Sequence, residues 1–397
     1  MMPRSGPPMK LFLLGNQARA MANFWSVLIR RAVAAGHEVV CAVPHALPSD
    51  DPVWEAKLSA LGVRLAHYPL DRKGLNPLRD LRTVLALRAL LTTENPDRLF
   101  AYTIKPVIYG AVAAALAGAP ERRHRTLMIT GLGYAFEADS LPKRILRRVT
   151  SLLYRTAFSL SGTVYFQNMD DRKLFDAFSI IPDSITARMC RGTGVDTVHF
   201  APSPLPELPD TPTPEHPAIF LFVGRLLEAK GLRELCQAAR LIKERGVPAV
   251  VRLLGPAESG LGSMPLEEIL ALRDEGVIEY LGETADVRPF IAEAHALVLP
   301  SWREGTPCSL MEGMSMGRAV VAADAPGSRE VVRPGENGLM VPLRDAEALA
   351  DALTQLARDP QRLRAMGAAG RALALAEFDA ETVAAGILTD MNLEQPD

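Results

Sequence analysis

The chain has 397 residues, of which 48% are hydrophobic and 23% charged, and its formal net charge is −2. This length predicts more than one domain, and the near-neutral charge argues against a general nucleic-acid-binding protein, which would carry a large basic surplus. The four cysteines (Cys41, Cys190, Cys236 and Cys308) lack disulfide-like or metal-like spacing, which favours a reduced, cytoplasmic setting.

Strand and helix patterns alternate along the first half of the chain. We expect a buried strand at Leu11–Leu14 ending at Gly15, a helix through Phe24 to Gly36 and a second strand at His37–Val43. The further expected elements are a helix at Pro77–Leu91, a strand at Leu99–Tyr102, a helix at Val107–Gly118 and a strand at Thr126–Ile129. Repeated strand–helix–strand units predict a parallel sheet.

A proline-rich stretch divides the sequence. Residues 201–217 include seven prolines, and proline fixes φ and lacks a backbone donor, so we expect a semi-stiff linker there. The expected organisation is an N-terminal Rossmann-like domain at 1–200, the linker at 201–217 and a C-terminal Rossmann-like domain at 218–375. Residues 376–397 are expected to form a helix that packs back toward the N-terminal domain.

Beyond the linker the alternation restarts. The expected elements are strands at Ala218–Val223, Val250–Leu254, Val277–Leu281, Ala296–Pro300 and Ala319–Ala322, and helices at Leu232–Arg245 and Thr306–Gly317. The fold class is therefore α/β, with two doubly wound domains. Ligands of such sheets bind outside the carboxyl ends of the strands, so we expect a cleft where these ends face each other.

One candidate site follows the first strand of the C-terminal half. Gly224, Arg225 and Lys230 lie in the loop between that strand and the next helix. Two cations on a short loop can neutralise a diphosphate, arginine through a planar fork and lysine as a point charge. Taken alone, the same pattern also fits ordinary solvated loop cations.

A second candidate site surrounds the expected helix at 306–317. Thr306 suits a helix N-cap and Pro307 the first helical position, which would present backbone N–H groups to an anion. Glu304 and Gly305 come just before the helix. Glu312 lies among apolar residues, where a carboxylate needs a partner such as a ribose. The alternative is an ordinary helix start with a stray glutamate.

These motifs, with the later run Gly327–Val332, resemble the family 4 retaining glycosyltransferases of the GT-B fold. The resemblance implies that Arg225 and Lys230 bind the donor diphosphate, that Glu304 contacts the donor sugar and that Glu312 binds the nucleotide ribose. Backbone groups of Gly305, Thr306 and Pro307 would hold phosphate and sugar. The implied substrate is a UDP-sugar. No His or Cys cluster or Asp-x-Asp pair suggests a metal, so we expect metal-independent catalysis and no cofactor.

The N-terminal half resembles a narrower subgroup. The runs Thr103–Gly110 and Ile129–Gly133 are similar to enzymes acting on polyprenyl-diphosphate-linked sugars, among them N-acetylgalactosaminyltransferases. This resemblance implies a lipid-linked acceptor, with Gly15 close to donor or acceptor and with Lys105, Thr130 and Gly131 as candidate acceptor contacts. Lys105 could equally be a plain loop lysine. Many family members have histidine before the glycine that matches Gly131, whereas this chain has Thr130.

A basic segment suggests a membrane surface. Residues 140–169 contain Lys143, Arg144, Arg147, Arg148 and Arg155 and no acidic residue, with Leu146, Val149, Leu153 and Ala157 at helical spacing. Such a helix can lie on an anionic bilayer, or it can pack on the domain with a solvated basic face. No apolar run reaches the roughly 18 to 20 residues of a membrane span, so we expect any action at a membrane to take place at its surface. With the lipid-linked acceptor that the resemblance implies, we expect a peripheral enzyme on the cytoplasmic face of the inner membrane.

Rival functions fit less well. Gly313–Gly317 has the spacing of a hydrolase nucleophile elbow, but a helix precedes the serine and no histidine follows His295. No Gly-x-Gly-x-x-Gly follows the first strand, so nothing supports a nicotinamide-dependent dehydrogenase. A nucleotide-sugar epimerase of the same fold and a catalytically silent partner in a glycan complex remain as alternatives.

Overall fold

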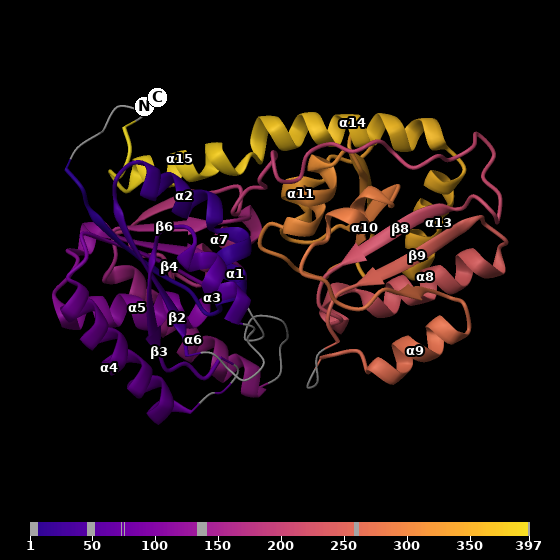
Figure 1. Cartoon of the computed structure of the whole chain (residues 1–397). Helices are drawn as coiled ribbons and strands as arrows, with labels where there is room; N and C mark the ends of the chain where they lie inside the picture. Colours follow the sequence, from indigo (N-terminus) through magenta and orange to yellow (C-terminus); the bar gives the residue numbers. More distant parts are fainter. Residues whose placement is uncertain are drawn as a thin grey trace. The chain divides into compact units, whose positions relative to one another are not determined.

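The computed structural model describes residues 7–45, 52–72, 74, 76–132, 141–257 and 262–395. The chain divides into two compact units (Figure 1). Unit 1 comprises residues 1–194 and 380–397, and unit 2 comprises residues 195–379. The division falls ahead of the proline-rich stretch, which therefore belongs to unit 2.

Unit 1 is a parallel sheet with helices on both faces. Its strands are β1 (Lys10–Leu14), β2 (Glu38–Pro44), β3 (Arg64–Tyr68), β4 (Arg98–Tyr102), β5 (Arg125–Ile129), β6 (Thr163–Phe166) and β7 (Thr186–Met189). Its helices are α1 (Ala18–Phe24), α2 (Ser26–Ala34), α3 (Pro52–Ser59), α4 (Pro77–Glu94), α5 (Ile104–Ala117), α6 (Leu141–Ser159), α7 (Met169–Ala177) and α15 (Ala380–Asp390), with a short 3₁₀ turn at Arg122–His124.

The strand order in unit 1 is β3-β2-β1-β4-β5-β6-β7. Side chains of β1 alternate between two apolar cores: Phe12 and Leu14 face one, and Leu11 and Leu13 face the other. Helices α4, α5 and α6 cover the first core and α2 and α15 the second. Burial on both faces explains why the strands read as continuous apolar runs.

The chain returns to unit 1 at its C-terminal end. Helix α15 packs on α2 and buries Ile387 and Leu388 in the second core. The Arg31 guanidinium donates a 2.8 Å hydrogen bond to Glu394, just beyond the helix. These contacts attach the last helix to unit 1, which takes in the chain again from Ala380.

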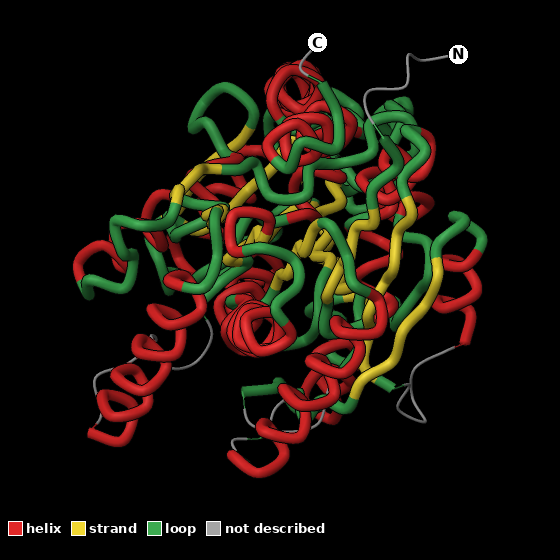
Figure 2. The backbone as a smooth tube through the Cα atoms, turned by 90° about the vertical axis from the view of Figure 1, so that its left-hand side faces the viewer, coloured by secondary structure: helices red, strands yellow, loops and turns green. Residues whose placement is uncertain are grey.

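Unit 2 repeats the architecture with a smaller sheet. Its strands are β8 (Ala218–Val223), β9 (Ala249–Leu254), β10 (Glu279–Tyr280), β11 (Ala296–Leu299), β12 (Ala319–Ala323) and β13 (Gly338–Val341). Its helices are α8 (Leu232–Glu244), α9 (Leu266–Asp274), α10 (Arg288–Ala292), α11 (Cys308–Ser315), α12 (Ser328–Val331), α13 (Ala346–Ala357) and α14 (Pro360–Glu377), with a 3₁₀ turn at Glu228–Lys230. The strand order is β10-β9-β8-β11-β12-β13, all parallel. Figure 2 shows strands bordered by helices, as expected for the α/β class.

Two sequence-based expectations need correction. The helix expected after Gly15, through Phe24 to Gly36, is broken at Trp25 and forms α1 and α2. The buried Trp25 ring lies with its centre 4.9 Å from that of Phe100 and 5.0 Å from that of Tyr102. The stretch 201–217 is also more than a linker. The fully buried Arg318 guanidinium donates to the Ser203 and Pro204 carbonyls at 2.9 Å each, which fixes its start to unit 2.

Candidate active site

Both sheets reverse their strand order at one point, and the predicted site residues follow the strands on either side of it. In unit 2 the reversal lies between β8 and β11, the strands that precede Arg225 and Glu304. In unit 1 it lies between β1 and β4, the strands that precede Gly15 and Thr103. Ligands of open α/β sheets bind outside the carboxyl ends of the strands at such points.

The unit 2 site contains an ion pair between two predicted residues. Lys230 Nζ lies 2.5 Å from Glu304 Oε1, and the Ser301 hydroxyl donates to the same oxygen at 2.5 Å. Lys230 and Glu304 are 23% and 14% exposed, whereas Ser301 is fully buried. The fold thus brings together two residues 74 positions apart and places an ammonium beside a carboxylate at the carboxyl end of the sheet. Arg225 is exposed on the same loop, directly after Gly224.

Glycines let the loops around this ion pair approach each other closely. A Cβ on Gly231 would lie 2.1 Å from the Pro300 carbonyl oxygen, and one on Gly255 would lie 1.9 Å from the Gly224 carbonyl oxygen. At Gly327 it would lie 2.4 Å from the Gly305 carbonyl oxygen. All three glycines have positive φ, a conformation that side chains disfavour. The carboxyl ends of β8, β9, β11 and β12 thus form one tightly packed set of loops.

The start of helix α11 differs from the predicted one. The helix begins at Cys308, with Pro307 as its N-cap, so Thr306 is not the cap and Pro307 is not the first helical residue. Pro307 has an extended ψ of 106° and no side chain that can cap the helix, whereas Thr306 is buried in the preceding bend. The positive end of the helix still faces the loop that carries Glu304 and Gly305, as an anion site requires.

Glu312 lies in the second turn of α11 between the buried residues Met311 and Gly313. Among the described residues no cation or hydrogen-bond donor offsets the burial of its carboxylate, which raises its pKa to about 7. A carboxylate in this environment is stabilised by a ligand that brings hydroxyl donors. The geometry therefore suits the predicted ribose contact, which stays a prediction.

In unit 1, Gly15 contacts the hydroxyl groups of two tyrosines, Tyr68 and Tyr102. A Cβ on Gly15 would lie 2.2 Å from the Tyr102 hydroxyl oxygen, and the Tyr68 hydroxyl donates to the Gly15 carbonyl at 2.7 Å. The Tyr102 hydroxyl and Thr103 Oγ1 are buried and have no hydrogen-bond partner among the described residues, and Thr103 has a φ of 66°. Strained backbone and unsatisfied polar atoms concentrate at functional sites, so this end of the sheet is a candidate ligand site.

Lys105 does not support the predicted acceptor-phosphate contact. Its ammonium donates to the carbonyls of Asp71 and Gly74 at 2.7 Å each and to Asp80 Oδ1 at 2.8 Å. An ammonium has three protons, and all three are used within unit 1. Lys105 therefore stabilises the segment before α4 and has no donor left for an acceptor phosphate in this arrangement.

The other predicted acceptor residues follow β5, the neighbour of β4. Thr130 and Gly131 are half-buried there, and Gly131 has a φ of +143° with no atom of the described residues within 4 Å of where a Cβ would project. They therefore lie at the same edge of the sheet as Gly15 and Thr103. Gly133 lies outside the described residues.

The predicted basic helix is α6, and its residues divide between two environments. Arg144 and Arg148 are exposed, whereas Arg147 is half-buried, with its guanidinium 5.0 Å from the centre of the Phe178 ring. Val149 and Leu153, two of the predicted apolar residues, are 51% and 39% exposed. The side chain of Lys143 lies outside the described part of the chain. No helix in that part is long and apolar enough to span a membrane.

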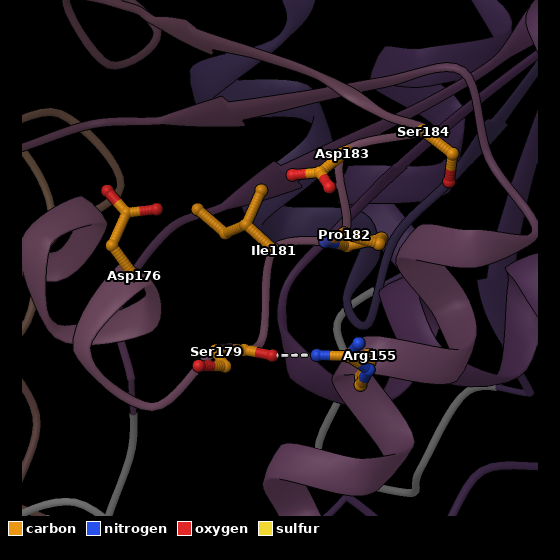
Figure 3. A pocket seen from close by; sticks show the side chains of 7 residues that line it. All are labelled: Arg155, Asp176, Ser179, Ile181, Pro182, Asp183 and Ser184. Carbon is orange, nitrogen blue, oxygen red and sulfur yellow. Dashed lines mark hydrogen bonds between the residues drawn. The ribbon is translucent and has the colours of Figure 1, made fainter.

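A surface pocket lies elsewhere on unit 1, around the segment 179–184 that leads into β7 (Figure 3). Arg155 at the end of α6 donates to the Ser179 carbonyl, and Asp176 and Asp183 add acidic groups. Arg155 belongs to the basic segment singled out in the sequence, but none of the predicted donor or acceptor residues lines this pocket. Across the described ranges no group of three or more His, Cys, Asp or Glu side chains could hold a metal ion.

Sequence reasoning gave no site role to Ser301, Gly231, Gly255 or Tyr102. Gly255 follows β9 as Gly224 follows β8, so a search for glycine after each strand would have found it. Ser301 stands three residues before Glu304 in the same short loop, so its position in the sequence was a usable signal. Tyr102 is 87 positions from Gly15, and only the folded sheet brings its hydroxyl there.

Comparisons with known proteins identify the family of this chain. Residues 217–359 match the family described as glycosyl transferases group 1, and residues 19–165 match the glycosyl transferase 4-like domain. The chain belongs to this family of GT-B glycosyltransferases and is itself a glycosyltransferase.

Two curated relatives illustrate the family. The chain is 25% identical to the N,N'-diacetylbacillosaminyl-diphospho-undecaprenol alpha-1,3-N-acetylgalactosaminyltransferase of Campylobacter jejuni, across 95% of this chain and 96% of the relative. It is 24% identical to the UDP-Gal:alpha-D-GlcNAc-diphosphoundecaprenol alpha-1,3-galactosyltransferase of Escherichia coli, across 75% of this chain and 76% of the relative.

A solved structure shares the fold. HepE from Anabaena in complex with UDP superposes with a TM-score of 0.71 at 18% identity and covers 96% of this chain and 98% of its own. The likeness extends over both units, which supports the assignment of the GT-B fold.

Proposed function

We propose that this glycosyltransferase moves an N-acetylhexosamine from a UDP-sugar to a polyprenyl-diphosphate-linked saccharide in surface-glycan or glycoprotein-glycan assembly. The observation that carries the donor half is the packed set of loops around Lys230 and Glu304. The acceptor half is supported by the two relatives, whose names both specify a saccharide on diphospho-undecaprenol. UDP-N-acetylgalactosamine is the first donor to test, followed by UDP-N-acetylglucosamine and deoxy sugars.

The proposed reaction needs no metal and retains the anomeric configuration. The bond between the anomeric carbon and the β-phosphate oxygen breaks, and the acceptor hydroxyl oxygen bonds to the same face of the sugar. The acceptor proton passes to a phosphate oxygen of the departing UDP. Arg225, Lys230 and the start of α11 stabilise the charge that develops on the diphosphate, the kind of preorganised electrostatic effect that dominates many enzymes.

The Lys230–Glu304 ion pair supports a divided role for these residues. A donor phosphate competes for the ammonium, and the released carboxylate is then available to accept hydrogen bonds from the sugar hydroxyls. Ser301 holds the carboxylate in place during this exchange. Glu312 accepts from the ribose hydroxyls in the same scheme.

We further propose that the protein works peripherally on the cytoplasmic face of the inner membrane, with α6 toward an anionic surface. The exposed Arg144 and Arg148 lie beside the exposed apolar side chains Ile145, Val149 and Leu152, a combination suited to the interface of an anionic bilayer.

The test is UDP release by the purified protein with a panel of UDP-sugars and a polyprenyl-diphosphate-linked amino sugar, with and without EDTA. The proposal expects acceptor-dependent, EDTA-resistant release from one donor and a product with retained configuration by NMR. Release that requires a divalent metal would contradict the charge-stabilising role of the two cations. Epimerisation of the donor without an acceptor would contradict the transfer reaction itself.

A further inference from the structure

A second helix of unit 1 carries the same combination of groups as α6. Helix α4 begins at an Asn76 cap with Pro77 in its first turn, and its outer face exposes three leucines: Leu78 is 76% exposed, Leu81 54% and Leu85 50%. Their spacing of three and four residues puts them in one stripe on the helix. Large apolar side chains gathered in this way mark an interaction surface.

The charged residues that border this stripe are positive. Arg82 and Arg88 are exposed and flank the leucines at helical spacing. The two acidic residues of α4 are engaged within the unit, Asp80 with Lys105 at 2.8 Å and Glu94 with Arg64. The outer face of α4 therefore presents leucine and arginine together, which fits an anionic, partly apolar partner.

Helix α6 presents a matching stripe. Ile145, Val149 and Leu152 are 58%, 51% and 65% exposed, and Arg148 and Arg155 are exposed along one side of them. The buried side of the same helix, with Tyr154 and Phe158, packs into the core. The apolar residues of α6 are thus divided between a face that packs into the core and a face that the described residues of unit 1 leave exposed.

The two stripes belong to one layer of the unit. Helices α4 and α6 both pack on α5, and all three cover the same face of the sheet, in the lower part of unit 1 in Figure 1. Each follows a parallel strand, α4 after β3 and α6 after β5, so each begins at the carboxyl edge of the sheet. The exposed apolar residues lie in the first three turns of α4 and within the first four turns of α6, counted from the edge that carries Gly15 and Thr103.

We infer that α4 and α6 together seat unit 1 on an anionic lipid bilayer, with α4 supplying a second contact through Leu78, Leu81 and Leu85. This inference rests on the proposed lipid-linked acceptor. A single amphipathic helix on a surface leaves the protein free to rotate about it, whereas two helices on either side of α5 fix its orientation. The strand ends with Gly15, Thr103 and Thr130 would then be held close to the headgroups, where a polyprenyl diphosphate emerges from the bilayer.

The test is sedimentation of the full-length protein with vesicles of phosphatidylcholine containing phosphatidylglycerol, or of phosphatidylcholine alone. The expected result is binding to the anionic vesicles that weakens with salt. The L78Q/L81Q/L85Q variant of α4 and the I145Q/V149Q/L152Q variant of α6 should each bind at least roughly tenfold more weakly, because each removes one of two apolar contacts with the bilayer. Leu116→Gln is the matched control, because Leu116 is 55% exposed near the other end of α5.

Wild-type affinity of the α4 variant for anionic vesicles would overturn the inference. So would a wild-type dimer in solution that the α4 variant converts to monomer, because the stripe would then be covered by a second copy. The double variant R82Q/R88Q, which leaves the leucines in place, should lower the salt dependence of vesicle binding. If vesicle binding behaves as expected but no lipid-linked acceptor is glycosylated, the proposed function fails and the membrane surface stands.

Discussion

The two units share a topology and differ in the chemistry at the point where the strand order reverses. In unit 2 this point combines an ion pair, exposed Arg225 and three glycines that bring four loops into contact. In unit 1 it combines a glycine, two tyrosines and a strained threonine, and its nearby lysine is already satisfied. The same scaffold thus provides a preorganised charged site in one unit and a largely uncharged one in the other.

This difference suggests how the work is divided. A charged, tightly packed site suits a diphosphate leaving group whose charge grows during the reaction. A less charged site suits an acceptor that must present a hydroxyl and be exchanged after each turnover. The following predictions test whether the two sites differ in this way.

The largest expected effect is at Arg225. We expect Arg225→Ala to lower turnover by roughly 10²- to 10³-fold, as when one charge-stabilising donor is removed from an active site. Arg240→Ala is the matched control, because Arg240 is exposed on α8 and pairs with Glu275. The measurement is steady-state UDP release at saturating donor. Full activity of the Arg225 variant would remove this arginine from the donor site.

Two glycines with the same backbone conformation should behave differently. Gly327 and Gly335 both have a φ of +84°, but a Cβ would meet the Gly305 carbonyl at Gly327 and nothing within 4 Å at Gly335. We expect Gly327→Ala to raise the donor KM by about tenfold or more, because the loop that carries Glu304 must move. Gly335→Ala should cost about 1–2 kcal/mol of stability with an unchanged donor KM.

Equal donor KM values in the two glycine variants would show that the close loop contact is irrelevant to donor binding. Thermal unfolding of both variants separates the strain that they share from the contact that only Gly327 makes.

Donor binding should depend on pH through Glu312. Its pKa is raised to about 7, and the ribose hydroxyls need the carboxylate, so UDP affinity should rise by up to about tenfold from pH 6 to pH 8. Because the folded pKa of Glu312 lies above the ordinary value of 4.5, ionisation of this one group should lower the stability of the free protein as pH rises from 4.5 to 7, and the effect is measured as the difference from Glu312→Gln. Calorimetric titration of UDP at several pH values measures the first effect.

Glu312→Gln is the comparison variant for this pH series. It should show a flat dependence of UDP affinity on pH and lack this group's contribution to the loss of stability between pH 4.5 and 7. A wild-type profile that is already flat would mean that Glu312 does not contact the nucleotide.

The smallest expected effect on catalysis is at Lys105. Because its three donors are used within unit 1, Lys105→Ala should lower the free energy of unfolding by roughly 1–3 kcal/mol and leave the donor Kd unchanged. Chemical denaturation and UDP titration measure the two quantities. Unchanged stability with a raised acceptor KM would instead restore the acceptor-phosphate role predicted from the sequence.

The sequence predicted unit 2 better than unit 1 for a physical reason. The strand at Ala218–Val223 was predicted with its observed bounds, and the predicted site residues Arg225, Lys230 and Glu304 stand in short segments after buried strands, so a local pattern places them at one edge of the sheet. In unit 1 the Lys105 side chain turned out to be bound by Asp71, Gly74 and Asp80, far away in sequence. No local pattern indicates such contacts.

The corrections follow the same rule. The N-cap of α11 is Pro307 rather than Thr306, and helix 24–36 is broken by Trp25, because tertiary packing decides both. Arg318 attaches the proline-rich segment to unit 2 by donating to the Ser203 and Pro204 carbonyls. These contacts join residues more than 100 positions apart, so no local sequence pattern predicts them.

The most direct test of the account is calorimetric titration of UDP into the full-length protein in EDTA. We predict saturable binding at one site that Lys230→Ala weakens by at least about tenfold, an effect of about 1.4 kcal/mol. Lys243→Ala, a lysine of α8 that bonds the Glu275 carbonyl, should bind UDP as the wild type does. Absence of UDP binding without a metal, or equal affinity in the Lys230 variant, would contradict the assignment of the donor site to the unit 2 loops.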